Sequence, residues 1–273
     1  MEKKNAQIGY HKSLENRNLR NIPDIRGILR QGFEEYGLTD IIDPWALQNL
    51  DCYSQMLLEK NQVMNLTAIR EPEGVARLHM LDCAALLKFC DFQNKTLIDV
   101  GTGAGFPGMV LKILVPSLDV TLLDSLNKRL DWLLESCGFL SLSNIRTVHA
   151  RAEEQALVKG YRDSFDFVTA RAVADLRLLC ELCLPYVKVG GKFLAMKSVD
   201  STSELEEATP AIQLLGGSVQ GIHDYIIPGT DVTHRLIIIE KLAPTRKGYP
   251  RRWAKMQKEP LIMEQSPESN SKM

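Results

Sequence analysis

The stretch Thr96-Leu-Ile-Asp-Val-Gly-Thr-Gly-Ala-Gly-Phe-Pro-Gly108 decides the fold of this chain. Residues 96–100 form a short apolar run with β-branched side chains, which is typical of a buried strand. Glycines are dense over residues 101–108, and apolar residues at helical spacing begin at Val110. A strand, a glycine turn and a helix in this order create a crevice at the carboxyl end of a parallel sheet. Glycine allows positive φ and lets a ligand lie against bare backbone beside a helix N-terminus.

A second apolar run, residues 120–123, ends in Asp124. A carboxylate at this position can accept hydrogen bonds from both hydroxyls of a ribose, so the two strands together predict a nucleoside site. Two ligand classes fit. Residues 103–108 match the glycine fingerprint of dinucleotide-binding proteins. Gly101, Gly103 and Gly105, with Asp99 before them, instead resemble the first motif of S-adenosylmethionine-dependent methyltransferases.

Composition indicates an ordinary globular protein. With 45% hydrophobic and 25% charged residues, the chain can bury a full core. Its net charge of −1 means that any nucleic-acid footprint must be local. No apolar run approaches the roughly 18 residues that cross a bilayer. The start, residues 1–7, is polar and lacks the apolar segment of a secretory signal, so we expect a cytoplasmic protein.

Four regions follow from the pattern along the chain. Residues 1–20 read as a polar, basic arm. Residues 21–95 predict a small helical region, with helix starts at Asp24 and at Asp43-Pro44 and a third helix over residues 74–89. Residues 96–241 predict the main domain, and residues 242–273 a basic tail that contains aromatic residues.

Strands and helices alternate throughout residues 96–241. Further strands are predicted at 145–149, 165–171 and 193–197, the last after a turn at Gly190-Gly191, and Gly138 is expected to end a helix over 126–137. Two final runs, 219–227 and 233–241, are joined by a short turn and predict an antiparallel hairpin. The fold expected is α/β: a Rossmann-like, seven-stranded, mostly parallel sheet. It favours a methyltransferase, because too little chain remains for the second domain of a nicotinamide dehydrogenase.

The tail combines basic and aromatic side chains. Arg251 and Arg252 stand between Tyr249 and Trp253. Basic residues neutralise phosphates and aromatic rings stack on bases, so the composition suits single-stranded RNA. A solvated charged segment is the other interpretation, and both stay open. No metal site is predicted, because Cys180-Glu-Leu-Cys183 lies within a helical pattern with no second Cys or His pair.

An ordered set of motifs carries a resemblance to a known family. The set runs Asn65-Leu-Thr67, Arg77-Leu-His79 with Leu81-Asp82, Asp99–Gly108, Leu122–Ser125, Arg151-Ala-Glu153, Thr169–Ala172 and Leu194–Lys197. Together they resemble the bacterial 16S ribosomal RNA guanine-N7 methyltransferase family (RsmG, or glucose-inhibited division protein B), over about residues 40–260. The resemblance implies a class I methyltransferase fold, S-adenosylmethionine as cofactor and the small ribosomal subunit as partner. We expect a monomer, although no residue pattern bears on oligomeric state.

The resemblance also assigns site residues. The family's cofactor positions carry over onto Gly101, Phe106, Ala152, Glu153 and Arg171. The glycine motif adds Gly103 and Gly105, and Asp124 is expected to hold the ribose. Guanine N7 offers a lone pair with no proton to remove, so proximity and alignment can supply most of the catalysis. Catalytic roles are assigned to Arg171, Arg151 and Lys197, and RNA contacts to His79, Arg151, Lys197, Arg251 and Arg252.

Other functions remain open at this point. Within enzymes, the acceptor could be another RNA position or a small molecule. From other classes, the glycine loop also suits a nicotinamide-binding oxidoreductase or a nucleotide-binding module without catalysis. Binding of S-adenosylhomocysteine but not NAD would exclude the nicotinamide-binding oxidoreductase.

Overall fold

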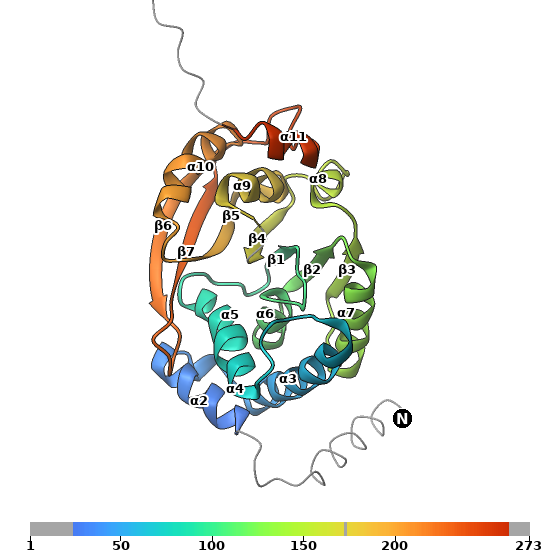
Figure 1. Ribbon diagram of the computed structural model, residues 1–273, viewed down its shortest axis with the longest axis vertical. Coiled ribbons are helices and arrows are strands. Elements are labelled where there is room, and N and C mark those ends of the chain that lie inside the picture. Colours follow the sequence, from blue (N-terminus) through green and yellow to red (C-terminus); the bar gives the residue numbers. More distant parts are fainter. Residues whose placement is uncertain (1–23, 172–173, 262–273) are drawn as a thin grey trace, which may run out of the picture.

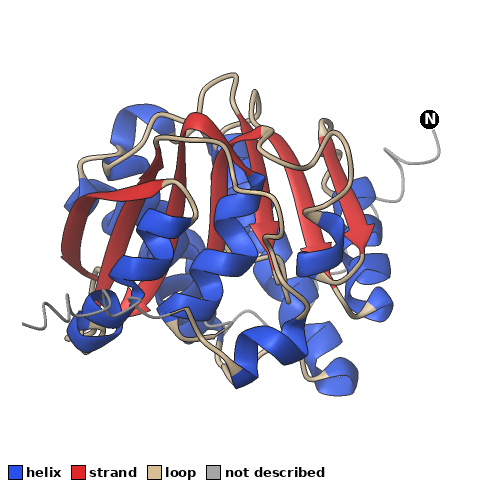
Figure 2. Ribbon diagram, turned by 90° about the horizontal axis from the view of Figure 1, so that it is seen from above, coloured by secondary structure: helices blue, strands red, loops and turns tan. Residues whose placement is uncertain are grey.

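The computed structural model describes residues 24–171 and 174–261, so the predicted arm at residues 1–20 lies outside the described residues (Figure 1). Within the described part, the chain forms a seven-stranded sheet in the order β3-β2-β1-β4-β5-β7-β6. Helices cover both faces of this sheet (Figure 2). The strands are β1 (Thr96–Val100), β2 (Asp119–Asp124), β3 (Ile145–His149), β4 (Phe165–Arg171), β5 (Val187–Ser198), β6 (Gly217–Ile226) and β7 (Thr233–Lys241).

The first five strands pair in parallel, and β7 pairs antiparallel with both β5 and β6. This confirms the predicted mostly parallel sheet with a terminal hairpin. The register places Val100 beside Leu123 and Asp124 beside His149, so the strand ends that carry the predicted ligand contacts meet at one edge. That edge is where open α/β sheets bind ligands.

Two aspartates begin the N-terminal helices as predicted. Asp24 accepts a hydrogen bond from the backbone N–H of Gly27 at the start of α2 (Ile25–Tyr36), which ends at Gly37 with φ of 69°. Asp43 accepts from the N–H of Ala46, and Pro44 opens α3 (Pro44–Met64). In both cases a side-chain oxygen satisfies a donor that the first helical turn leaves unpaired.

The third predicted helix is a succession of helical types. It consists of α4 (Pro72–Val75), the π-helical η2 (Ala76–Leu81), α5 (Asp82–Ala84) and the 3-10 segment η3 (Ala85–Lys88). π-Helical turns re-aim side chains within a helix and recur at functional sites. Here the π segment carries His79, and Asp82 follows it directly.

The helices after β1 follow the alternation predicted. They are α6 (Gly108–Leu114), α7 (Asn127–Phe139), α8 (Ala152–Gln155), α9 (Leu176–Cys183) with η4 (Leu184–Tyr186), α10 (Thr202–Leu214) and α11 (Trp253–Lys258). The short helices η1 (Thr39–Ile41), α8 and α11 lack an apolar period that a sequence pattern can reveal.

Two expected boundaries are wrong. Gly138 does not stop α7, which continues to Phe139 and is capped at Leu140. Gly190-Gly191 is not a turn before the fifth strand, because β5 already begins at Val187. Instead Gly190, with φ of 82°, sits where the pairing of β5 with β4 shifts register, so the glycines form an irregularity within one long strand.

Each face of the sheet has its own apolar cluster. The N-terminal helices pack with α6 and α7 in one cluster, so the predicted helical region shares its core with the main domain. The second cluster holds α9 and α10, and Met256 and Leu261 of the C-terminal segment are buried in it. Residues 242–261 are therefore packed on the domain (Figure 1). No helix in the described ranges is long and apolar enough to cross a membrane.

Candidate active site

A pocket of about 820 Å³ opens at the carboxyl ends of β1, β2 and β4. Most of the predicted site residues line it: Gly101, Gly103, Phe106, Asp124, Arg151, Ala152, Glu153, Arg171, Lys197 and His79. Gly105, Arg251 and Arg252 are not part of its lining. The structure thus brings together residues that lie between positions 79 and 197 of the sequence.

The glycine loop presents backbone to this pocket. Gly101, Gly103 and Gly105 have φ of 70°, 57° and 82°, a region that L side chains rarely adopt. A Cβ at Gly103 would meet nothing closer than 3.9 Å, so the surface there is open. A Cβ at Gly105 would instead lie 2.5 Å from the Tyr53 hydroxyl, so the loop packs against Tyr53 with no space for a side chain at position 105.

Asp99 fastens the loop to the sheet. One carboxylate oxygen accepts hydrogen bonds from Thr102 Oγ1 (2.6 Å) and the Gly108 N–H (3.1 Å), and the other accepts from Thr169 Oγ1 (3.0 Å). The residue is fully buried, and burial raises the pKa of its carboxyl, an effect that these hydrogen bonds oppose. Asp99 is therefore a structural part of the motif.

Asp124 also holds the loop. Its Oδ2 accepts from the Gly103 N–H (2.9 Å), and its Oδ1 accepts from the Leu126 N–H (2.9 Å). Arg129 lies 3.6 Å from Oδ2. Each carboxylate oxygen has a further lone pair, so the same side chain can accept from a ribose while it keeps both backbone contacts.

Arg171, at the end of β4, joins the sheet to the N-terminal helices. Its guanidinium donates to Asp82 Oδ2 (3.0 Å), to the Leu78 carbonyl (3.2 Å) and to His79 Nδ1 (2.9 Å). It also lies 5.1 Å from the centre of the Phe106 ring, a cation–π contact. Arg171 therefore orients the aromatic ring at the far end of the glycine loop.

Asp82 is the centre of a buried charge cluster that sequence analysis did not single out as a site. In addition to Arg171, it accepts from the Tyr225 hydroxyl (2.8 Å) and contacts His234 Nδ1 (2.7 Å). Burial alone would raise the pKa of Asp82, but the hydrogen bond from His234 and the charge of Arg171 outweigh it and lower that pKa. Asp82 stood in a recognised motif, whereas nothing in the sequence links His234 to it across 152 positions.

His79 is neutral in this arrangement. A guanidinium has donors only, so Nδ1 accepts from Arg171 and Nε2–H donates to Thr67 Oγ1 (2.7 Å). Burial, followed by the adjacent charge of Arg171, lowers the pKa of His79 to about 3. The imidazole stacks on Phe106 with ring centres 4.5 Å apart. The His79 ring therefore forms part of the pocket wall in a fixed orientation.

The two predicted basic residues Arg151 and Lys197 both line the pocket but differ in exposure and in pairing. Arg151 is exposed at the rim, immediately before α8. Lys197 is 12% exposed, lies 2.7 Å from Glu204 and donates to the Ala174 carbonyl. Arg151 is thus presented to solvent, whereas Lys197 is already paired.

The two tail arginines also differ. Arg251 forms a bidentate pair with the buried carboxylate of Glu181, at 2.7 and 2.8 Å, while Arg252 is exposed. Trp253 lines the pocket, although sequence analysis considered it only as part of a tail that could contact RNA. Its aromatic character in a basic segment was the signal that could have found it.

Comparisons with known proteins agree with the geometry. Residues 46–229 match the family model described as "rRNA small subunit methyltransferase G" (GidB). Proteins named ribosomal RNA small subunit methyltransferase G are similar to this chain in several bacteria. The protein of Clostridium perfringens is 46% identical over 215 residues, 78% of this chain and 90% of its own. That of Lachnoclostridium phytofermentans is 46% identical over 233 residues, 85% of this chain and 96% of its own. That of Acetivibrio thermocellus is 43% identical over 237 residues, 87% of this chain and 97% of its own.

The glycine loop, Asp124, Arg171 and the π-helical segment all lie inside the matched residues, and the match extends over most of both chains. The chain therefore belongs to the rRNA small subunit methyltransferase G (GidB) family.

Proposed function

We propose that this pocket binds S-adenosylmethionine and that the chain transfers its methyl group to N7 of a guanine in 16S ribosomal RNA. Membership of the family makes the chain a small-subunit rRNA methyltransferase that depends on this cofactor. The observation that carries the assignment to this pocket is the open glycine loop, which faces the pocket together with Asp124.

The residues present fit the cofactor. Gly101 and Gly103 line the pocket, Gly103 leaves room for a ligand against the backbone, and Asp124 offers acceptors to ribose hydroxyls. Ala152 and Glu153, at the start of α8, give an apolar surface and a carboxylate beyond the ribose position. When bound, S-adenosylmethionine supplies an electrophilic methyl group on its sulfonium.

No proton has to leave guanine N7, so the protein's task is placement. Arg171 is held by Asp82, His79 and Phe106, and it fixes the wall of the pocket next to the glycine loop. We assign it a positioning role. Arg151 and Lys197 are the residues proposed to reach the guanine edge or its phosphate, since arginine suits the O6 and N7 acceptors.

The RNA is proposed to lie across the rim that Arg151 and Arg252 expose. His79 faces the pocket but its two ring nitrogens are occupied, so its proposed contact with the guanine is through the ring. Arg251 is proposed to act on RNA indirectly, through the segment that it anchors. We further propose a monomeric enzyme, and a cytoplasmic one, since ribosomal RNA is its substrate.

The test is a transfer assay with tritiated S-adenosylmethionine and 30S subunits that lack their own modifications, followed by mass mapping of the RNA. Label on a guanine that carries an N7 methyl group is the expected result. Label at another atom would redirect the proposal to a different acceptor. Label at N7 on naked 16S RNA but never on the particle would keep the acceptor and make the free RNA the substrate. Binding of S-adenosylhomocysteine and not NAD, in the same preparation, excludes the oxidoreductase.

A further inference from the structure

The C-terminal segment, residues 242–261, returns from β7 to the pocket side of the domain. It contains α11, which packs against α9 (Figure 1). Met256 is fully buried in the apolar cluster that contains α9. A segment whose apolar side chains are buried in this way has a defined position relative to the pocket.

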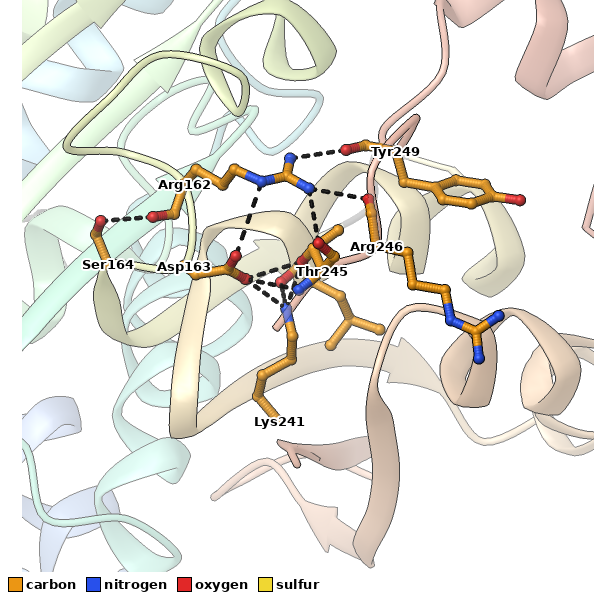
Figure 3. A network of polar contacts seen from close by, with 8 residues as sticks. Arg162, Asp163, Ser164, Lys241, Thr245, Arg246 and Tyr249 are labelled. Atoms are coloured by element: carbon orange, nitrogen blue, oxygen red, sulfur yellow. Dashed lines mark hydrogen bonds and ion pairs between the residues drawn. The ribbon is translucent and has the colours of Figure 1, made fainter. Parts of the chain in front are cut away.

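Two polar anchors fix the segment. In the first, shown in Figure 3, Arg162 donates to the carbonyls of Tyr249 (2.7 Å), Thr245 (2.9 Å) and Arg246 (3.0 Å). The buried ammonium of Lys241 contacts Asp163 (2.9 Å) and donates to Thr245 Oγ1 (2.6 Å). These contacts tie the start of the segment to the loop before β4.

The second anchor is the pair between Arg251 and Glu181. The guanidinium forms two hydrogen bonds to the carboxylate, and the Arg251 backbone N–H adds a third at 2.8 Å. The Glu181 side chain is 2% exposed, so this is a desolvated, bidentate pair with fixed geometry. It lies two residues before Trp253, and Glu181 directly precedes Leu182 of the pocket lining.

Trp253 is thereby held in the wall of the pocket. Leu182 belongs to the apolar cluster of this face, and Ala152 and Trp253 pack against that cluster. All three line the pocket, as does the carboxylate of Glu153. Ala152 and Glu153 follow β3 at one end of the strand order, whereas Arg171, which pairs with Asp82, ends β4 on the other side of β2 and β1, so the pocket has two distinct ends.

The two ends match the two ends of the cofactor. With the ribose at Asp124, the charged methionine part suits the polar end, and the flat, uncharged adenine suits the apolar end. Adenine also carries an exocyclic amine that can donate to a carboxylate such as Glu153. Aromatic side chains stack on bases without regard to their hydrogen-bonding edge.

We propose that Trp253 forms an aromatic wall against the adenine of S-adenosylmethionine, so that the anchored C-terminal segment completes the cofactor site. This rests on the proposed function only in taking S-adenosylmethionine as the ligand of the pocket. It gives residues 249–253 a role in cofactor affinity rather than in RNA contact alone.

The test measures S-adenosylhomocysteine affinity by calorimetry in full-length variants. Trp253→Ala is expected to weaken binding about 10-fold, in line with the loss of one base–aromatic stack. Trp253→Phe keeps a flat ring and is expected to stay within about 3-fold of wild type. Trp45→Ala, at a half-exposed tryptophan outside the pocket lining, is the matched control and leaves affinity unchanged.

A second measurement does not depend on the alanine variant folding. The chain has three tryptophans, so Trp45→Phe with Trp132→Phe leaves Trp253 as the sole emitter. Saturating S-adenosylhomocysteine should change its emission with the dissociation constant found by calorimetry. Unchanged emission at saturation overturns the proposal.

A third outcome identifies the alternative role. If Trp253→Ala binds S-adenosylhomocysteine as wild type does but needs more 30S subunits for half-maximal methyl transfer, the ring stacks on RNA and the proposal is wrong. Methyl transfer by the wild-type protein tests the proposed function separately, so the two can fail independently.

Discussion

The guanidinium of Arg171 and the carboxylate of Asp82 lie 3.0 Å apart, although 89 positions separate them in the chain. The contact joins the end of β4 to the helical region that precedes the sheet. Asp82 has no exposed surface, and Tyr225 and His234 from the terminal hairpin complete its shell. One carboxylate thus connects three parts of the chain around the pocket.

Asp82→Asn should destabilise the fold. It leaves the Arg171 cation mostly buried without its counter-charge, and breaking such a pair costs about 3–5 kcal/mol. Urea unfolding at neutral pH measures the loss. Asp224→Asn removes an exposed partner of Arg235 and should cost less than about 1 kcal/mol. Equal losses of unfolding free energy in the two variants would show that burial does not increase the contribution of the Asp82–Arg171 pair to stability.

His79 should make stability fall as the pH drops. The unfolded chain binds a proton at this ring near pH 6.5, and the folded chain binds it only near a pKa of about 3. Between these values the unfolded state holds more protons, so the free energy of unfolding decreases by up to about 1.4 kcal/mol per pH unit. His79→Gln should show a shallower decrease between pH 6.5 and 4 in urea titrations. A slope equal to that of the wild type in His79→Gln would contradict the prediction.

Gly105→Ala and Gly103→Ala should differ although both residues have positive φ. At Gly105 the new Cβ would overlap Tyr53 and Met109, each 2.5 Å away, which adds about 1–3 kcal/mol to the backbone strain. At Gly103 the new Cβ meets no neighbour, so the backbone strain is the only cost, at about 1–2 kcal/mol. Gly103→Ala should therefore fold but lose S-adenosylhomocysteine binding, because its methyl group faces the pocket. Thermal unfolding and calorimetry separate the two effects, and intact cofactor binding by Gly103→Ala would remove the loop from the cofactor site.

Asp124→Asn should weaken cofactor binding by roughly 10-fold or more, since a hydrogen bond to a charged acceptor contributes about 1.5–3 kcal/mol. The amide oxygen can still accept from the Gly103 N–H, although the amide NH2 group then replaces the oxygen that accepts from the Leu126 N–H. Calorimetry with S-adenosylhomocysteine is the measurement. An affinity equal to that of wild type would exclude Asp124 as the ribose ligand.

Arg151→Ala and Arg251→Ala form a matched pair. Arg151 is exposed at the rim, so its loss should reduce the salt dependence of RNA binding by about one counterion while stability and cofactor affinity stay unchanged. Arg251→Ala leaves the Glu181 carboxylate buried without a partner and should lower stability and cofactor affinity together. Filter binding of RNA at several salt concentrations tests Arg151→Ala. An unaltered slope of log affinity against log salt concentration would exclude a phosphate contact by Arg151.

The sequence by itself determined the sheet, its order of elements and the glycine loop. Residues 96–124 carry strand, turn and helix signals within a short span, and such signals depend on local backbone preferences and periodicity. The same local information placed the limits of β1, β3, β4 and β7 as the structure has them. It could not show that Gly190 lies within β5, because a glycine pair has the same composition in a turn and in a strand irregularity.

Only the tertiary structure decided how the pocket is closed. His234 meets Asp82 across 152 positions, and the Arg162 and Glu181 anchors bring Trp253 to the pocket from the far end of the chain. A local pattern cannot encode these meetings, since they arise from the sheet order and from the burial of charged groups that must find partners. The basic C-terminal segment had two interpretations in the sequence, and in the structure its apolar side chains and Arg251 are bound to the domain.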